Sequence, residues 1–233
     1  MRETNKLPKT TLVNRKEFIC NECKDKSVIH LGCTGGLLDK HSIEEYINNF
    51  DKTNDTHSKI ANYAKDLTGL DISAEKIEIM KKCNVAGNFE VGNICDKDLN
   101  LKNKYEIILF ANLIEHLDNI GIALENCAKI MNYDSKLIIT TVNAFTLERL
   151  IKLIFNYESN HVEHTCYFSY ITIKRILEMN NFKIDEFYFA NNERTEFSGF
   201  IDIFSTKISH LISKKFKAFS DDIIVCASKI KTR

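Results

Sequence analysis

A short apolar run that ends in a glycine-rich turn constrains the fold of this chain more than any other feature. The run begins at Ser27 and reads S-V-I-H-L, and the turn that follows reads G-C-T-G-G and ends at Gly36. An apolar run bounded by turn residues predicts a buried parallel strand. The glycines allow a tight turn and leave backbone N–H groups open to a ligand. The stretch therefore predicts a strand followed by a loop that cradles a cofactor.

A carboxylate stands at the end of the next strand-like run. This run ends at Asp71, 35 residues after Gly36. In open α/β sheets, ligands bind beyond the carboxyl ends of the strands, where an acidic side chain accepts hydrogen bonds from ribose hydroxyls. The loop and Asp71 together predict a cofactor that contains a nucleoside, and the alternative for Asp71 is a solvated turn residue.

The loop resembles that of the class I S-adenosylmethionine (SAM) dependent methyltransferases, which usually reads as an acidic residue followed by L-G-C-G-x-G. Gly32, Cys33 and Gly36 match this pattern, whereas His30 replaces the acid and Thr34 replaces the middle glycine. A dinucleotide-binding fingerprint fits less well, because its second and third glycine positions hold other residues.

Three later segments resemble the same family in the same order. The sequence A-N-L-I-E-H-L at 111–117 is similar to the family's E-H-L segment after the fourth strand. The sequence T-T-V-N at 140–143 is close to the family's T-x-P-N, without the proline. The turn at 160–169 carries H-x-x-H, an aromatic pair and serine, as in small-molecule and sugar-modifying members. This ordered set, over roughly residues 26–230, carries the resemblance.

The resemblance implies an α/β fold: a Rossmann-like, doubly wound, seven-stranded, mostly parallel sheet with helices on both faces and an antiparallel last strand. Its cofactor would be SAM, with Asp71 on the ribose and two isoleucines around the adenine. Asn93 stands where the family commonly has an aspartate for the adenine amino group, and Asp96 is a rival for that contact. The expected cofactor-binding residues are His30, Gly32, Cys33, Thr34, Gly36, Asp71, Ile72, Asn93, Ile94 and Asn112.

Apolar runs place the expected elements along the chain. Residues 1–25 are interpreted as an N-terminal arm or a short helix laid over the domain, and residues 26–233 as the methyltransferase domain. Within the domain, the spacing at 42–47 predicts a helical turn, and apolar residues at i, i+4 spacing predict a helical insert at 197–219. Strands are expected at 27–32, 66–71, 89–91, 105–110, 137–142, 183–188 and 222–227.

Three histidines are the candidates for catalysis. Methyl transfer from a sulfonium is an in-line displacement, so the protein mainly holds the methyl group and its acceptor in line. If the acceptor is a hydroxyl, an imidazole is a suitable base near neutral pH. The resemblance puts His116, His161 and His164 on the acceptor face. His116 is alternatively a residue that orients its segment, and His161 and His164 could bind zinc with Glu163, but no third strong ligand is evident and no metal is predicted.

Composition limits the partners. The 233 residues include 32 basic and 32 acidic ones, so no overall electrostatic field favours nucleic acid or an anionic membrane.

Residues 1–18 lack the apolar core of a targeting peptide, and no later run approaches ~18 apolar residues. The eight cysteines indicate reduced core residues, and the C-x-x-C pair Cys20 and Cys23 has no second pair to complete a zinc site. We expect a cytoplasmic protein with a small-molecule acceptor and leave a homodimer open.

The resulting hypothesis is a methyltransferase that O-methylates a small molecule, a sugar-type group destined for a surface polysaccharide. This acceptor rests on analogy with the family. A quinone precursor is the alternative acceptor, and an apolar pocket around the 197–219 insert would favour it. A third alternative is a methyltransferase-like scaffold without catalysis, since Thr34 and Asn93 depart from the family pattern. RNA methylation is disfavoured unless a basic patch forms around residues 207–217.

Overall fold

The computed structural model describes residues 6–35, 47, 50, 53, 55–191 and 199–230. Gly36, nearly all of the helical turn expected at 42–47 and the first two residues of the expected insert lie outside this part of the chain.

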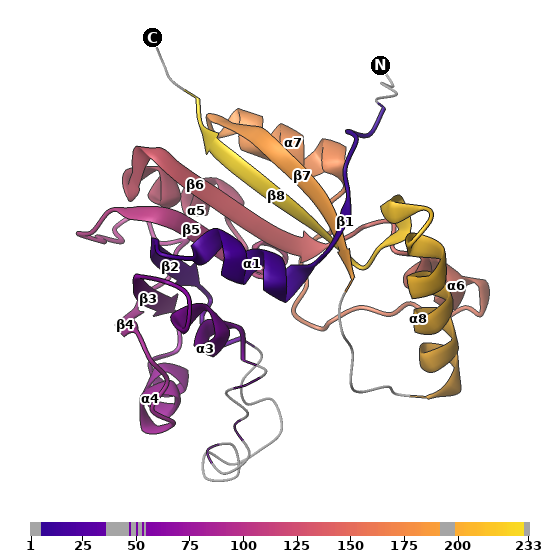
Figure 1. The fold of residues 1–233 in the computed structure, drawn as a ribbon, viewed down its shortest axis with the longest axis horizontal. Helices are drawn as coiled ribbons and strands as arrows, with labels where there is room; N and C mark the ends of the chain where they lie inside the picture. The colour runs from indigo at the N-terminus through magenta and orange to yellow at the C-terminus, as the bar shows by residue number, and fades with distance from the viewer. Residues whose placement is uncertain are drawn as a thin grey trace.

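In the described residues, eight strands form one sheet in the order β1-β7-β8-β6-β5-β2-β3-β4. β8 runs antiparallel to both of its neighbours, and every other pairing is parallel (Figure 1). The expectation of a mostly parallel sheet with an antiparallel last strand is therefore confirmed, and one edge strand is added. The strands are β1 (Leu12–Asn14), β2 (Ser27–Leu31), β3 (Asp66–Asp71), β4 (Asn88–Val91), β5 (Tyr105–Ala111), β6 (Met131–Val142), β7 (Phe182–Asn191) and β8 (Asp222–Lys229).

The register of the central strands determines where the site lies. β2 pairs in parallel with β3 and β5, and Leu31 lies opposite both Leu70 and Phe110. All three side chains are almost fully buried, as expected for strands covered on both faces. Because these strands end in register, the residues that follow them, among them Gly32, emerge at the same edge of the sheet.

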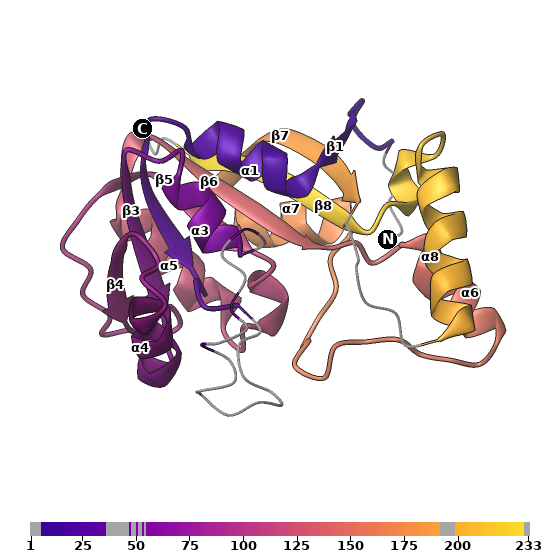
Figure 2. The same ribbon diagram turned by 60° about the horizontal axis from the view of Figure 1, so that its bottom comes forward.

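Helices cover both faces, as expected from the sequence. α1 (Arg15–Cys23) and α3 (Thr56–Ala61) pack on one face, and α5 (Ile120–Lys129) and α7 (Tyr170–Met179) pack on the other (Figure 2). α4 (Ala74–Lys82) follows β3 and packs beside β4 through a smaller apolar cluster. The fold is thus a three-layer α/β/α arrangement with an apolar core on each side of the sheet.

Two further helices stand at the end of the sheet remote from β4. α6 (Leu147–Ile154) and α8 (Phe200–Ser213) lie side by side in Figures 1 and 2. α8 confirms the helical insert expected at 197–219, which also contains the short 3₁₀ helix η2 (Lys217–Phe219). α6 was not expected. Another 3₁₀ helix, η1 (Ile114–His116), follows β5.

The expected N-terminal arm contains two regular elements. β1 pairs in parallel with the outer edge of β7, so that Leu12 lies opposite Phe189. Asn14 then caps α1 by accepting a hydrogen bond from the backbone N–H of Glu17 at 3.1 Å. Residues 12–23 therefore extend the sheet and cover one face of it.

No helix among the described residues is long and apolar enough to cross a membrane.

Candidate functional site

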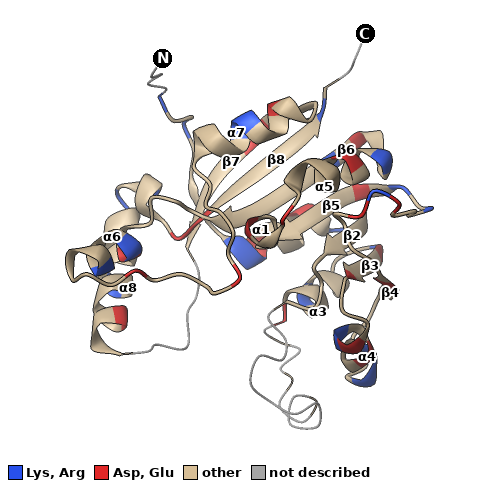
Figure 3. Ribbon diagram, turned by 180° about the vertical axis from the view of Figure 1, so that it is seen from behind, with Lys and Arg blue, Asp and Glu red and all other residues tan. Residues whose placement is uncertain are grey.

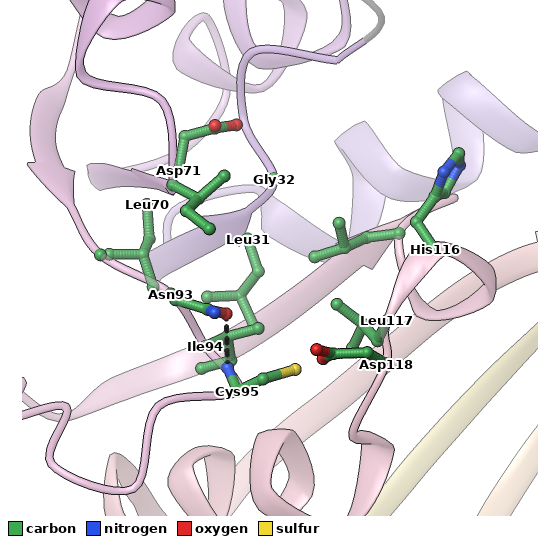
Figure 4. Close-up of a pocket in the computed structure, with 13 residues that line it drawn as sticks. Leu31, Gly32, Leu70, Asp71, Asn93, Ile94, Cys95, His116, Leu117 and Asp118 are labelled. Atoms are coloured by element: carbon green, nitrogen blue, oxygen red, sulfur yellow. Dashed lines mark hydrogen bonds between the residues drawn. The ribbon is translucent and has the colours of Figure 1, made fainter. Parts of the chain in front are cut away.

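A cavity of about 350 Å³ opens at the carboxyl ends of β2 and β3. Figure 4 shows Leu70 and Asp71 on one side of it and Leu117 and Asp118 on the other. The lining residues are Leu31, Gly32, Leu70, Asp71, Ile72, Gly92, Asn93, Ile94, Cys95, Leu113, His116, Leu117 and Asp118. Of the predicted site residues, six line the cavity: Gly32, Asp71, Ile72, Asn93, Ile94 and His116.

Gly32 begins the loop above β2 and has no room for a side chain. Its φ of +67° lies in the left-handed region, and an added Cβ would lie 2.7 Å from a methyl group of Leu113. Its backbone N–H donates to the carbonyl of Leu70 at 2.8 Å. A glycine is therefore required here both for the turn and for the approach of the segment after β5.

Asp71 joins the loop to the end of β3. Its Oδ2 accepts hydrogen bonds from the Thr34 hydroxyl at 2.7 Å and from the Thr34 backbone N–H at 3.2 Å. Its Oδ1 accepts one from the backbone N–H of Ser73 at 3.0 Å. Thr34 thus gives the loop a side-chain anchor that the family's glycine cannot supply.

The adenine side of the expected site has two different isoleucines. Ile72 is 68% exposed at the cavity wall, whereas Ile94 belongs to the buried core. The side-chain oxygen of Asn93 accepts a hydrogen bond from the backbone N–H of Cys95 at 2.9 Å (Figure 4). Ile72 and Ile94 thus both line the cavity, and apolar side chains in a cavity wall suit a flat aromatic ring.

His30 and Cys33 lie behind the loop, away from the cavity walls. The Nδ1 atoms of His30 and His57 lie 3.2 Å apart, and both rings are buried. Burial and the mutual repulsion of the two rings hold the pKa of His30 well below its usual range, and burial lowers the pKa of His57 to about 4. Burial raises the pKa of the Cys33 thiol to about 12. These side chains support the loop rather than face the cofactor cavity.

Asn112 also stands outside the cavity walls, where it ties β5 to β6. Its φ is +53°, and its backbone N–H donates to the carbonyl of Thr140 at 3.0 Å. The hydroxyl of Thr140 donates to the Asn112 side-chain oxygen at 2.6 Å.

The three candidate catalytic histidines come together. The ring centroids lie 4.6 Å apart for His116 and His164, 5.5 Å for His116 and His161, and 5.3 Å for His161 and His164. His116 follows β5 in η1 and lines the cavity, while the other two belong to the loop between α6 and α7. The structure therefore places the predicted acceptor face next to the predicted cofactor site.

Glu115, the residue before His116, is fully buried. One oxygen of its carboxylate accepts a hydrogen bond from the Thr141 hydroxyl at 2.8 Å. Burial raises the pKa of this carboxyl to about 7. The E-H-L segment thus points its glutamate into the core and its histidine toward the cavity.

Several cavity residues were missed by sequence reasoning. Leu113, Leu117 and Asp118 flank His116 in the segment after β5, and Cys95 follows Asn93. The match to the E-H-L segment was the signal that could have identified the first three, because a loop at that strand end must face the ligand.

A comparison with known protein families identifies the domain. A family profile described as a methyltransferase domain matches residues 11–186. No curated protein matches the chain.

Solved structures share the fold at low sequence identity. An S-adenosylmethionine-dependent methyltransferase from Clostridium acetobutylicum has a TM-score of 0.57 and 10% identity, over 93% of this chain and 91% of that one. The N-methyltransferase NodS from Bradyrhizobium japonicum, in complex with S-adenosylhomocysteine, has a TM-score of 0.52 and 11% identity, over 93% and 85%. The magnesium protoporphyrin IX methyltransferase from Synechocystis, with the same ligand, has a TM-score of 0.52 and 15% identity, over 92% and 80%.

The loop, the carboxylate at the end of β3 and the family match over most of the chain lead to one assignment. The chain belongs to the methyltransferase-domain family, and it shares its fold with S-adenosylmethionine-dependent methyltransferases.

Proposed function

We propose that this methyltransferase acts on a small molecule and O-methylates a hydroxyl of a sugar or a related building block of a surface polysaccharide. The proposal rests chiefly on the polar side chains beside the cofactor cavity. His116 lines the cavity, and His161 and His164 extend the same surface outward. Imidazoles both donate and accept hydrogen bonds, which suits an acceptor with several hydroxyl groups.

A tyrosine and an arginine continue this polar surface. The Arg149 guanidinium lies 4.4 Å from the centre of the Tyr167 ring, and the Tyr167 hydroxyl bonds to the side chain of Asn160. The ring centroids of Tyr167 and His164 are 5.9 Å apart. A guanidinium in this place suits a phosphate group, so phosphorylated sugars and sugar nucleotides are the first acceptors to test.

His116 is the side chain that we assign as the base. It is the histidine of the three that lines the cavity, and burial lowers its pKa, so that the ring is neutral and able to accept a proton at pH 7. A carboxylate oxygen of Glu163 lies 3.6 Å from its Nδ1. When the acceptor hydroxyl passes its proton to His116, Glu163 stabilises the imidazolium that forms. The displacement itself needs the acceptor oxygen in line with the methyl group and the sulfur.

The structure supports the alternatives less well. A second cavity of about 570 Å³ lies at the 197–219 insert, where an apolar acceptor would favour a quinone precursor. Its wall includes Lys152 and Asp202, whose charged groups are 2.8 Å apart. A charged wall of this kind does not favour an apolar ring.

The hypothesis of a scaffold without catalysis rested on Thr34 and Asn93, which depart from the family pattern, and the structure gives both residues another explanation. Thr34 hydrogen-bonds to Asp71, and Asn93 hydrogen-bonds to the backbone of its own turn. Both departures from the family pattern therefore make hydrogen bonds at the edge of the sheet where the cavity opens.

The distribution of charged side chains bears on nucleic acid as a partner. Figure 3 shows basic and acidic residues side by side on α4 and on the pair α6 and α8. This mixture is the reason that we do not propose nucleic acid as a partner. A cytoplasmic location likewise stays a prediction from the sequence.

Binding of SAM and methylation of an acceptor are tested separately. SAM is titrated by calorimetry into wild type, Asp71→Ala and Thr34→Val. Asp71→Ala removes the carboxylate, whereas Thr34→Val removes only the hydroxyl that donates a hydrogen bond to it. We expect Asp71→Ala to weaken binding about tenfold or more, because ribose hydrogen bonds to a charged group are each worth about 1.5–3 kcal/mol. Thr34→Val should weaken it less. Equal binding by wild type and Asp71→Ala would contradict the assignment of Asp71.

The acceptor is sought with methyl-labelled SAM and pools of free sugars, sugar phosphates and sugar nucleotides. Transfer of label by wild type, reduced by His116→Gln while SAM still binds, is the expected result. A wild-type protein that binds SAM and labels none of these pools would overturn the sugar proposal and leave the methyltransferase assignment intact.

A further inference from the structure

Three histidine nitrogens from distant parts of the chain converge at the mouth of the cofactor cavity. One candidate ligand atom from each of His116, His161 and His164 can be chosen so that all three lie within 4.8 Å of one another. The H-x-x-H motif in the sequence supplied only two of these side chains. His116, 45 positions before His161 in the chain, supplies the third.

The spacing requires only small movements to hold a metal ion. Zinc binds histidine nitrogen at about 2.0–2.1 Å, so tetrahedral ligands lie roughly 3.4 Å apart. His161 and His164 sit on a loop, and His161 is exposed. The Nδ1 of His161 accepts the backbone N–H of Glu163 in an exposed bond of 3.3 Å. Coordination through Nε2 keeps this bond, and coordination through Nδ1 costs little because the bond is long and exposed.

A buried nitrogen in the cluster lacks a hydrogen-bond partner. The Nδ1 of His164 is inaccessible to solvent and bonds to no atom in the part of the chain that the structure describes. Such atoms in native proteins usually have a partner, which can be a water molecule or an ion.

The charges around the cluster act in opposite directions. Glu163 brings a carboxylate oxygen to 3.6 Å from the Nδ1 of His116, where it can orient that ring or serve as a further ligand. Arg149 carries a positive charge near the cluster, and its guanidinium is held by the Asn143 carbonyl and the Tyr167 ring. Glu163 offsets this charge, and the donor set consists of three imidazoles.

We propose that His116, His161 and His164 form a binding site for a divalent transition-metal ion, with zinc the expected occupant. Imidazole nitrogens suit zinc, copper, nickel and iron better than magnesium or calcium. Since His116 also lines the cofactor cavity, the ion would lie beside the acceptor, where an open coordination position can take an acceptor oxygen. In the metal-bound protein His116 would be a ligand and not the base, and the ion would replace the base by polarising the acceptor hydroxyl, whose proton would pass to solvent. The metal site does not depend on the identity of that acceptor.

The test measures metal binding directly on the full chain. Metal-free protein is titrated with Co²⁺ and followed by its visible absorption, and Zn²⁺ affinity is measured by competition with a chromophoric chelator. We expect one ion per chain. His161→Ala and His164→Ala should each weaken Zn²⁺ binding by at least about tenfold, the lower end of the loss seen when even a supporting residue of a metal site is removed.

Two controls separate this site from other metal-binding groups. His210→Ala removes a histidine on α8 that bonds to Asp221, outside the cluster. Cys20→Ser with Cys23→Ser removes the C-x-x-C pair, whose thiols are buried on α1 and have raised pKa values. Neither control should change Zn²⁺ affinity, and SAM binding measured by calorimetry should persist in all variants.

Two results would overturn the proposal. One is wild-type protein that binds neither ion in a one-to-one ratio. The other is binding that the cysteine variant abolishes while His161→Ala, exposed and tolerant of truncation, leaves it unchanged. Either result would leave the histidines as hydrogen-bonding groups on the acceptor face, and SAM binding would still test the methyltransferase assignment independently.

Discussion

Single residues behind the cofactor loop show how closely its support is packed. Gly69 on β3 has no space for a side chain, because an added Cβ would lie 2.6 Å from the Cys33 sulfur and 2.9 Å from the His57 ring. The His57 ring in turn lies against His30 and, at 5.0 Å between centroids, against Phe89. A neutral, buried pair of imidazoles thus fills the space beneath the loop.

This pair predicts a pH dependence of stability. The pKa of His57 is about 4 in the folded protein and 6.5 in its ordinary state, so the unfolded chain binds the extra proton between these values. Stability that His57 contributes is therefore present above pH 6.5 and is lost as the pH falls toward 4. From pH 7 to pH 5 the loss from His57 is about 2 kcal/mol, at 1.36 kcal/mol per pKa unit.

Urea unfolding at pH 7 and pH 5 measures this effect. His57→Gln should be less stable than wild type at pH 7 but should lose about 2 kcal/mol less on going to pH 5. Phe89→Leu is the matched control, because it disturbs the same contact without removing a titrating group. A His57→Gln variant with the wild-type pH slope would show that His57 does not titrate in this range.

At the scale of elements, an ion pair joins the first residue of α1 to the sheet. Arg15, the first residue of α1, donates from Nη1 to Oδ2 of Asp222 at 3.0 Å. Asp222 begins β8 and is fully buried. Burial raises the pKa of Asp222 to about 6, and the Arg15 charge opposes that rise. The N-terminal elements therefore neutralise a charge inside the domain.

Arg15→Met should accordingly destabilise the protein in a pH-dependent way. At pH 8 the loss should be about 3 kcal/mol, because an unpaired buried carboxylate remains. At pH 5 the loss should be much smaller, since Asp222 is then protonated and has no charge to pair. The free energy of unfolding measured at both pH values checks this, and Arg15→Met with Asp222→Asn should recover most of the stability at pH 8. An equal loss at both pH values would assign the effect to packing of α1 alone.

The sequence predicted those elements and site residues whose patterns are local. Most of the seven expected strands are apolar runs that the helices bury, and Gly32, Asp71 and Asn93 stand at or just after strand ends, at the edge where the cavity opens. β1 escaped prediction because three residues give no readable period, and its position depends on pairing with β7.

The surroundings of a side chain were harder to predict than its position. The burial of Glu115 depends on Thr141, which belongs to another strand. The meeting of His116 with His161 depends on how the loop after α6 folds back over η1. Contacts between segments far apart in the chain leave no mark in a local pattern. The sequence therefore placed the three histidines on one face only through the family resemblance, and the structure gave the distances between them.

At the scale of the whole molecule, the exposed faces of α6 and α8 indicate an interface with a second copy of the chain. The side chains that α8 buries are all polar: Asp202, Ser205, Thr206, Ser209 and Ser213. On α6 the buried side chains are Glu148 and Lys152, and Lys152 bonds to both Glu148 and Asp202. Large apolar side chains face outward instead, with exposed fractions of 81% for Phe200 and 77% for Ile154. Helices on the surface of a monomer normally bury apolar side chains and expose polar ones, and α6 and α8 show the opposite arrangement.

We expect a homodimer in which these outward faces of α6 and α8 pack against the same faces of a second copy. A twofold axis brings identical surfaces together, and a net charge of zero does not oppose their approach.

Sedimentation velocity at micromolar concentrations should show the dimer. Phe200→Ser with Leu211→Ser should shift it to monomer without lowering the melting temperature, because both side chains are exposed in a single chain. Met179→Ser, an exposed apolar change on α7, should leave the dimer intact. Wild-type protein that stays monomeric at about 100 μM would contradict this arrangement, since a specific homodimer interface of standard size normally holds well below that concentration.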